Sequence, residues 1–196
     1  MKLTKLKLGV AAMSSLALAG TLTLGMSSVA GAAPKHFSNP GVTDTGTSSN
    51  LQFTGGTIDS VPVTVNCTSF VASGVVPSKG LSITLSAPPT ISGCTDSLGG
   101  TDTVTTKGTG WKLVANSSGS TLTLDQPSKS ATFTSSALST CTVTAGPAKV
   151  AGSYNNLNAE TISSGGPVKT KGSGCSTGGS TVVNASVSFN QNESVV

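Results

Sequence analysis

Short runs in which apolar and polar residues alternate recur along the chain from about residue 51, and they constrain the fold more than any other feature. Leu81, Ile83 and Leu85 alternate with Ser and Thr, and Leu122 and Leu124 alternate with Thr in the same way. A period of two places successive side chains on opposite faces of a β-strand. We expect further strands at 61–67, 101–106, 111–115, 131–135, 141–145 and 180–189.

Clusters of Gly, Pro, Asn and Ser separate these runs, and no segment after residue 32 has a sustained helical period. Alternating Thr suits a sheet that has one face in water. Charged residues make up 9% of the chain, whereas disordered chains are usually rich in charge and poor in β-branched residues. The pattern therefore predicts an all-β protein, an antiparallel β-sandwich or small barrel of about eight to ten short strands.

The first thirty-odd residues have the composition of a secretory signal peptide. Three lysines in the first seven residues precede an apolar run at 8–24, which ends in small residues. A charged region, an apolar region and a small-residue cleavage site are the three parts of such a signal. We predict a signal peptide at 1–32 that is cleaved after Ala32, with Ala30 as the alternative. The protein would then be secreted through the general pathway, with no membrane span left.

The rest of the chain is long enough for one domain with a proper core. Residues 33–50 are polar and rich in turn-forming residues, so we expect a flexible lead-in there. Residues 51–196 are expected to form a single β domain, because the alternating runs fill this range.

The formal net charge of +4 belongs mostly to the predicted signal. Its three lysines leave with it, and the chain that remains carries about +1. The chain has no arginine, the residue that most often makes two-pronged contacts to phosphate. We therefore expect no nucleic-acid partner.

The four cysteines are Cys67, Cys94, Cys141 and Cys175. An even number in an exported chain predicts two disulfides, for which sequence alone allows three pairings. Cys94 and Cys175 each follow a Gly and precede a Gly-Gly pair and a strand-like run. We interpret this as a degenerate two-fold repeat and predict the pairs Cys67–Cys94 and Cys141–Cys175. There is no C-x-x-C and one histidine, so no metal site is expected.

In this interpretation each Gly-Cys holds the return of a long loop. Each Gly-Gly pair, Gly99–Gly100 and Gly178–Gly179, then leads the chain into its next strand.

Catalytic signatures are weak. His36 is the sole histidine, it falls in the predicted lead-in, and no G-x-S-x-G motif occurs. Asp96 and Asp102 are the closest acid pair among the predicted strands, in a Gly-rich turn where Asp is common for structural reasons. We predict a protein that is not an enzyme and needs no cofactor. The enzymatic alternative is a small glycan hydrolase that uses this carboxylate pair.

Two aromatic residues could mark a binding surface. Trp111 lies beside Lys112 at a strand start, and Tyr154 precedes Asn155 and Asn156. Aromatic and amide side chains together suit contacts to protein or carbohydrate. The alternative, which we favour for Trp111 and leave open for Tyr154, is that Trp111 anchors the core and Tyr154 holds a corner of the sandwich. We predict a secreted binding or structural protein whose partner is an extracellular protein, a glycan or a second copy of itself. A small-molecule carrier is a further alternative.

The order of "GCTDSLGGTDTVTTKGTGWKL", "LSTCTVTAGP", "GSYNNLN" and "GSGCSTGG" resembles small exported four-cysteine bacterial proteins that have no assigned activity. This resemblance implies an exported Gram-positive β protein and no particular function. The ending "SVSFN" is similar to that of neocarzinostatin-type apoproteins, two-disulfide sandwiches that close shorter loops. That likeness implies a fold and nothing more.

Overall fold

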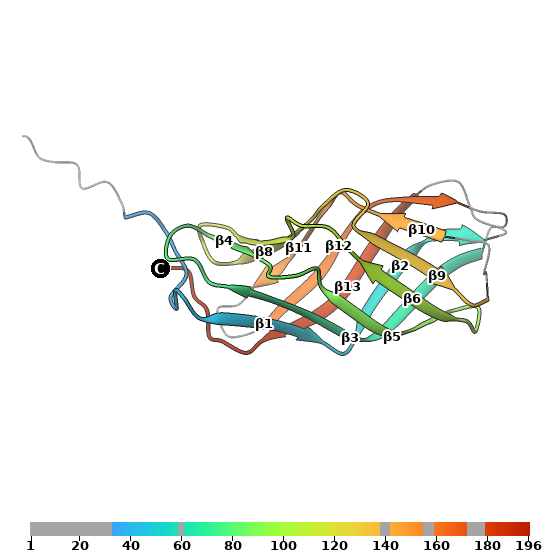
Figure 1. Cartoon of the computed structure of the whole chain (residues 1–196), viewed down its shortest axis with the longest axis horizontal. Coiled ribbons are helices and arrows are strands. Elements are labelled where there is room, and N and C mark those ends of the chain that lie inside the picture. Colours follow the sequence, from blue (N-terminus) through green and yellow to red (C-terminus); the bar gives the residue numbers. More distant parts are fainter. Residues whose placement is uncertain (1–32, 59–60, 138–141, 155–158, 172–178) are drawn as a thin grey trace, which may run out of the picture. The chain divides into compact units, whose positions relative to one another are not determined.

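The computed structural model describes residues 33–58, 61–137, 142–154, 159–171 and 179–196, and Pro34–Val196 form one compact unit. Within the described residues the structure is all-β, with thirteen strands that pair antiparallel and no helix (Figure 1). The predicted all-β antiparallel class is therefore confirmed, although there are more strands than the eight to ten expected. The strands are β1 (Thr43–Ser48), β2 (Leu51–Ile58), β3 (Val61–Val75), β4 (Ser82–Thr84), β5 (Thr90–Asp96), β6 (Thr101–Thr106), β7 (Lys112–Ala115), β8 (Thr121–Gln126), β9 (Ala131–Ser135), β10 (Thr142–Ala145), β11 (Ala148–Tyr154), β12 (Ala159–Lys171) and β13 (Gly179–Phe189).

Three long strands, β3, β12 and β13, run through two closed rings of strand pairings. The first ring passes through β2, β3, β5, β6, β9, β10, β12 and β13 and returns to β2. We call this part the disulfide lobe, because it contains the bond between Cys67 and Cys94. Figure 1 shows its strands β2, β5, β6, β9 and β10 on the right.

The second ring uses the other ends of the same three long strands. It passes through β3, β1, β13, β12, β11, β8, β7 and β4. It closes where Gly74 of β3 bridges Leu85, next to a bond from the Ser86 N–H to the Ser73 carbonyl (2.9 Å). We call this part the tryptophan lobe, since Trp111 immediately precedes its strand β7.

The tryptophan lobe holds most of the fully buried apolar side chains of the described chain. Alternation in β7 and β8 buries one face of each strand, as the sequence predicted for Leu122 and Leu124. Aromatic and branched side chains from β3, β4, β11 and β13 fill the same interior. The buried residues are Phe37, Phe70, Ala72, Val76, Ile83, Leu85, Trp111, Leu113, Ala115, Leu122, Leu124, Val150, Tyr154, Ala185, Val187 and Phe189.

The inward face of β3 changes between the two lobes. In the disulfide lobe Val65 and Cys67 pack inward, whereas from Phe70 the even-numbered residues are buried. The change occurs at Thr68 and Ser69, where the alternation of apolar residues is interrupted. The sequence pattern therefore indicated only the first half of this strand, 61–67.

The expected flexible lead-in at 33–50 is wrong for this fold. Phe37 is buried in the core, and β1 pairs with β3 along its whole length. Asp44, Gly46 and Ser48 occupy the inward positions of β1, so the strand has no apolar period. Polar and glycine residues in the interior explain why the sequence pattern missed it.

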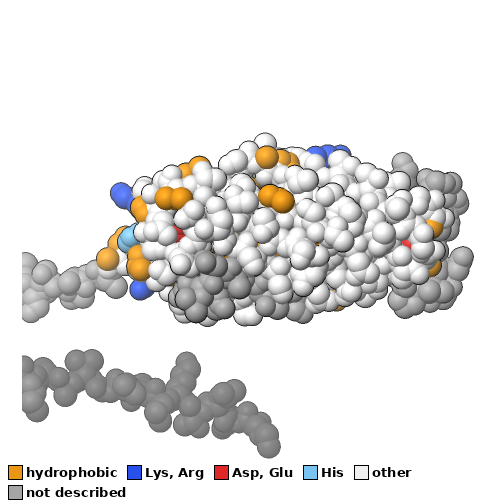
Figure 2. Space-filling view, turned by 90° about the horizontal axis from the view of Figure 1, so that it is seen from below, with side chains coloured by type: hydrophobic (Ala, Val, Ile, Leu, Met, Phe, Trp, Pro, Cys, Tyr) orange, Lys and Arg blue, Asp and Glu red, His pale blue; other side chains and the backbone are white. Residues whose placement is uncertain are grey.

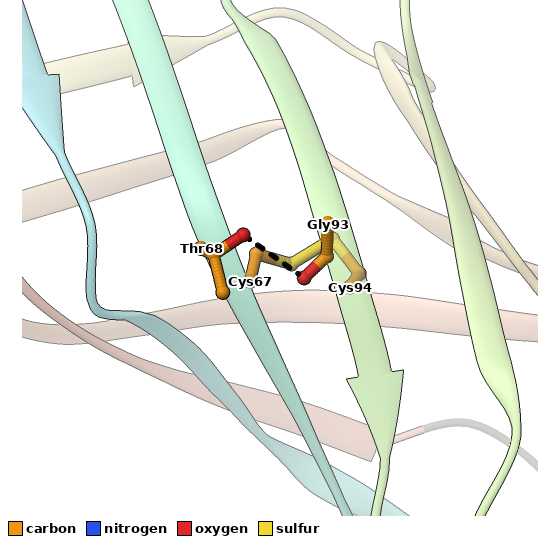
Figure 3. Close-up of a disulfide and its surroundings, with 4 residues drawn as sticks. All are labelled: Cys67, Thr68, Gly93 and Cys94. Atoms are coloured by element: carbon orange, nitrogen blue, oxygen red, sulfur yellow. Dashed lines mark hydrogen bonds between the residues drawn. A yellow bond between two sulfur atoms is a disulfide. The ribbon is translucent and has the colours of Figure 1, made fainter.

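The disulfide between Cys67 and Cys94 confirms the predicted first pair (Figure 3). The two cysteines lie directly opposite each other on β3 and β5, and both are buried. Cys141 and Cys175 lie outside the described residues, so the second predicted pair stays a prediction.

Gly93 lies inside strand β5 and not in the loop that the sequence suggested. Its φ of +64° is in the left-handed region, and a Cβ there would meet the Thr68 hydroxyl at 2.1 Å. Thr68 donates a hydrogen bond to the Gly93 carbonyl across the strand pair (3.4 Å; Figure 3). The glycine before Cys94 therefore permits close contact of two strands.

Candidate functional sites

Trp111 lies in the core of the tryptophan lobe. Its side chain is 4% exposed, and its indole N–H donates to the Lys107 carbonyl (3.2 Å). The ring therefore offers no face to a partner. Of the two possibilities left open by the sequence, a contact surface and a core position, the structure shows the core position. Lys112, the next residue, alternates to the outside of β7 and is exposed.

Tyr154 is likewise buried, with 6% of its side chain exposed. Its hydroxyl donates to the Glu193 carbonyl (2.5 Å), and its ring meets Phe189 edge-on with centroids 6.1 Å apart. This tyrosine holds the C-terminal segment and does not form a binding surface. Asn155 and Asn156, the amides expected beside it, lie outside the described residues.

A different surface runs across the outer side of four adjacent strands of the disulfide lobe, β5, β6, β9 and β10. Threonines occupy outward positions on each of these strands and face one another in register. Thr103 pairs with Thr134, which in turn pairs with Thr142 on the next strand. We call this surface the threonine face; its members are Thr95, Thr101, Thr103, Thr105, Thr132, Thr134, Thr142 and Thr144.

The threonine face is a two-dimensional grid of identical side chains. Strand geometry sets a spacing of about 4.8 Å across strands and about 6.7 Å along them. Thr101, Thr103, Thr105 and Thr134 are exposed, and the remaining members on β9 and β10 are half-buried. Each member offers a hydroxyl that both donates and accepts, next to a methyl group. The face of the molecule shown in Figure 2 has few charged side chains.

Sequence reasoning interpreted these threonines as the wet side of a sheet and did not predict the grid. The T-x-T spacing in 101–106, 131–135 and 142–145 was visible. The register that aligns Thr103 with Thr134 was not, because it depends on pairing between β6 and β9.

The structure brings the predicted acid pair Asp96 and Asp102 together in the disulfide lobe. Asp96 ends β5, and its carboxyl organises the turn to β6 by accepting the N–H groups of Leu98 (2.9 Å) and Gly100 (2.8 Å). Its other oxygen accepts the Ser135 hydroxyl from β9. Burial by itself would raise the pKa of Asp96, but these three donors outweigh it and hold that pKa below 3.8.

Asp102 has the opposite electrostatic environment. It lies opposite Cys94 on β5 and Ser135 on β9, and its Oδ2 is buried with no hydrogen-bond partner among the described residues. Burial, and then the nearby charge of Asp96, raise the pKa of Asp102 to about 6. The carboxyl of Asp96 therefore favours the ionised form, whereas that of Asp102 takes up a proton near pH 6.

Two kinds of feature are absent from the described residues. They contain no group of three or more His, Cys, Asp or Glu side chains placed to hold a metal ion. No helix in the described part of the chain has the length and apolar character needed to cross a membrane.

Comparison of the chain with protein-family models, with curated proteins and with solved structures finds no match. The resemblances drawn from the sequence therefore stay predictions, and a function has to be argued from this chain's own residues.

Proposed function

We propose that this chain is an exported protein without enzymatic activity that binds a neutral polysaccharide through the threonine face. The observation that supports the proposal most is the grid itself, in which four neighbouring strands present threonine at register-matched outward positions. Export rests on the predicted signal at 1–32, and the disulfide Cys67–Cys94 is compatible with it.

The chemistry of the face selects the class of partner. Its outward positions on β5, β6, β9 and β10 carry hydroxyls and no charge, so a charged partner would lose hydration there without gaining an ion pair. The charge next to the face is at its edge, where Lys169 and Lys171 of β12 stand opposite Thr144 and Thr142. A polysaccharide without charge matches the face, because sugar hydroxyls donate and accept hydrogen bonds as threonine hydroxyls do.

The rigidity of the face favours binding to a repeating polymer. Threonine is β-branched and stiff at χ1, so little side-chain freedom is lost when a ligand orders it. Each hydroxyl contributes weakly, and affinity would come from several contacts along one polymer chain. Trp111 and Tyr154 are buried, so stacking of sugars on these two rings is not part of the proposal.

The test is co-sedimentation of the mature chain with insoluble neutral polysaccharides such as cellulose, chitin and an α-glucan. Thr103→Val with Thr134→Val removes two facing hydroxyls and keeps the shape of the side chains. We expect the wild type to sediment with at least one polymer. The double variant should bind at least about five-fold more weakly, because it has lost two hydrogen bonds to the polymer.

The matched control is Thr43→Val with Thr84→Val, two exposed threonines of the tryptophan lobe. This variant should bind as the wild type does. Equal loss in both double variants, or no binding by the wild type to any polymer, would contradict the proposal. Self-association would appear instead as concentration-dependent sedimentation without polymer.

Export has its own test. Protein collected from culture supernatant should begin at Ala33, as N-terminal sequencing would show. Retention of residues 1–32 in the mature protein would contradict it.

A second candidate function is general acid–base catalysis by Asp96 and Asp102. The opposite directions of their pKa shifts favour it, because a protonated and an ionised carboxyl side by side can serve as acid and base. One oxygen of Asp96 is engaged in the turn and the other accepts the Ser135 hydroxyl of β9, which favours a structural role for this residue.

Hydrolysis assays on soluble glycans decide between the two candidates. Turnover that Asp96→Asn and Asp102→Asn both abolish would support catalysis. No turnover by the wild type, together with polymer binding that both variants retain, would leave the threonine face as the functional surface.

A further inference from the structure

A second pair of buried carboxyls lies at the end of the tryptophan lobe, where the segments 34–42 and 190–196 meet. The two segments are tied by backbone hydrogen bonds, from Ser38 to Ser194 (2.9 Å) and in both directions between His36 and Val196 (3.1 and 2.9 Å). The carboxyl of an acidic residue near each segment also accepts a hydrogen bond from the other segment. The pair is Asp44, at the start of β1, and Glu193, after β13.

Glu193 is 2% exposed, so its carboxyl is almost fully removed from water. Its Oε2 accepts the backbone N–H of Asn39 (3.3 Å) and the hydroxyl of Ser38 (3.4 Å). Its Oε1 is buried and has no hydrogen-bond partner among the described residues. A buried carboxylate oxygen without a partner is costly, and it indicates that something else binds there.

Asp44 is 6% exposed and makes the reciprocal contact. Its Oδ1 accepts the backbone N–H of Gln191 (3.3 Å) from the C-terminal segment. Burial raises the pKa of Asp44, and the N–H groups of Gln191 and Thr45 lower it in part, while the charge of Glu193 raises it further. Gln191, which donates to Asp44, is two residues from Glu193, so both carboxyls lie at the junction of the two segments.

No basic side chain of the described residues balances these two charges. Neither Asp44 nor Glu193 forms an ion pair with a lysine or histidine; the one ion pair recorded there joins Lys149 and Asp125. Burying a carboxylate without a cation is costly. A proton or a bound cation must therefore reduce this cost.

The hydrogen bonds favour a cation over a proton. The groups that contact these carboxyls are N–H and O–H donors, which stabilise a carboxylate. A proton on Oε1 of Glu193 would itself need an acceptor, and none is found for that oxygen among the described residues.

We propose that Asp44 and Glu193 together bind one hard cation, with Ca²⁺ as the physiological ion of an extracellular protein. Two carboxylates are fewer than a tight site would use, so amide and carbonyl oxygens of the surrounding segments would complete the coordination. The neighbouring sequence 190–192, Asn-Gln-Asn, is rich in such oxygens. The affinity expected for so few charges is that of weak extracellular sites, with Kd of about 10⁻⁴–10⁻³ M.

Binding would lock the two terminal segments together. Glu193 contacts residues 38 and 39 of the N-terminal segment, and Asp44 contacts residue 191 of the C-terminal one. A cation held by both acids would therefore resist separation of these segments and stabilise the end of the tryptophan lobe.

The experiment compares thermal unfolding of chelator-treated mature protein at pH 7 with CaCl₂, with MgCl₂ and with NaCl at matched ionic strength. Ca²⁺ at about 100 times Kd should raise Tm by roughly 5–10 °C in a domain of this size. Glu193→Gln and Asp44→Asn should each abolish most of this rise. Asp102→Asn, an acid of the other buried pair, should retain it.

Terbium provides a second readout that does not depend on stability. Tb³⁺ replaces Ca²⁺ at oxygen sites and luminesces when a nearby tyrosine is excited. Tyr154 donates its hydroxyl to the Glu193 carbonyl, so it lies beside the proposed site. We expect luminescence that Ca²⁺ competes away, that Glu193→Gln abolishes and that Asp102→Asn leaves unchanged.

The proposal is overturned if Ca²⁺ does not raise Tm of the wild type, or raises it equally in Glu193→Gln. It is also overturned if Tb³⁺ luminescence persists in both Asp44→Asn and Glu193→Gln. Should Glu193→Gln fail to fold, Asp44→Asn and the terbium titration of the wild type carry the same test.

Discussion

The two lobes share three long strands and yet have different interiors. In the tryptophan lobe, the inward residues of β7 and β8 are Leu113, Ala115, Leu122 and Leu124, all buried. In the disulfide lobe, the inward residues of β6 include Asp102 and Val104, and these are half-buried. One lobe is thus stabilised mainly by apolar burial and the other by a disulfide and side-chain hydrogen bonds. Similar ring topology therefore does not require a similar core.

Replacing one aromatic residue of each lobe with alanine should give the largest difference between the lobes in the free energy of unfolding. Trp111→Ala removes a buried side chain and its hydrogen bond to Lys107, and should lower the free energy of unfolding by about 3–5 kcal/mol. Phe133 is half-buried and packs edge-on against Phe53, with centroids 4.8 Å apart. Phe133→Ala should cost about half as much. Urea unfolding of both variants measures the two values, and equal costs would contradict the contrast between the lobes.

Removal of the disulfide should be next in size. The variant Cys67→Ala with Cys94→Ala removes a bond between residues 27 positions apart in the sequence. In the chain-entropy model this lowers the free energy of unfolding by about 3.5 kcal/mol. Hydrogen exchange should show that amides of β5 and β6 lose protection before those of β7 and β8. Loss of protection at the same rate in both lobes would mean that the bond stabilises the whole unit uniformly.

The sequence predicted some strands better than others in both lobes, for a physical reason. Where a strand buries one apolar face, as Leu122 and Leu124 do in β8, a period of two is visible. Where inward positions hold Asp, Gly or Ser, as in β1, no period exists to be detected. β3 combines both problems, since its inward face changes at Thr68 and Ser69.

The candidate sites were predicted unevenly for a related reason. Nearness of Asp96 and Asp102 follows from a short turn, which local sequence encodes. The threonine face and the Asp44–Glu193 pair depend on strand pairing and on contacts between opposite ends of the chain. The burial of Trp111 and Tyr154 likewise depends on the whole fold, so single-residue reasoning left both possibilities open.

Substitution of two glycines of the disulfide lobe by alanine distinguishes the cost of backbone strain from that of side-chain crowding. Gly93→Ala faces a left-handed φ of +64° and the Thr68 hydroxyl at 2.1 Å, and should cost about 2 kcal/mol. Gly99→Ala has a φ of +85° and nothing within 4 Å, so it should cost about 1 kcal/mol. Chemical denaturation of both variants gives the difference. If Thr68→Ala fails to recover any stability in the Gly93→Ala background, crowding is not the cause.

The smallest expected effect concerns the buried acid of the disulfide lobe, and it depends on pH. The ordinary pKa of Asp102 is 3.8, and burial followed by the charge of Asp96 raises it to about 6 in the folded chain. Well below pH 3.8 the carboxyl is protonated whether the chain is folded or not, so it costs nothing. As pH rises from 4 to 6 the unfolded chain loses its proton first, and stability falls.

Asp102→Asn removes this cost, because the amide is neutral at every pH. The variant should therefore be more stable than the wild type at pH 7, by about 1–2 kcal/mol once solvent screening is allowed for. The difference should be much smaller at pH 4 and vanish below about pH 3. Asp125→Asn is the control: its partner Lys149 has 78% of its side chain exposed, and such a surface pair contributes at most about 0.5 kcal/mol. A gain for Asp102→Asn that is equal at pH 4 and pH 7 would show that packing, and not the buried charge, limits the stability of the disulfide lobe.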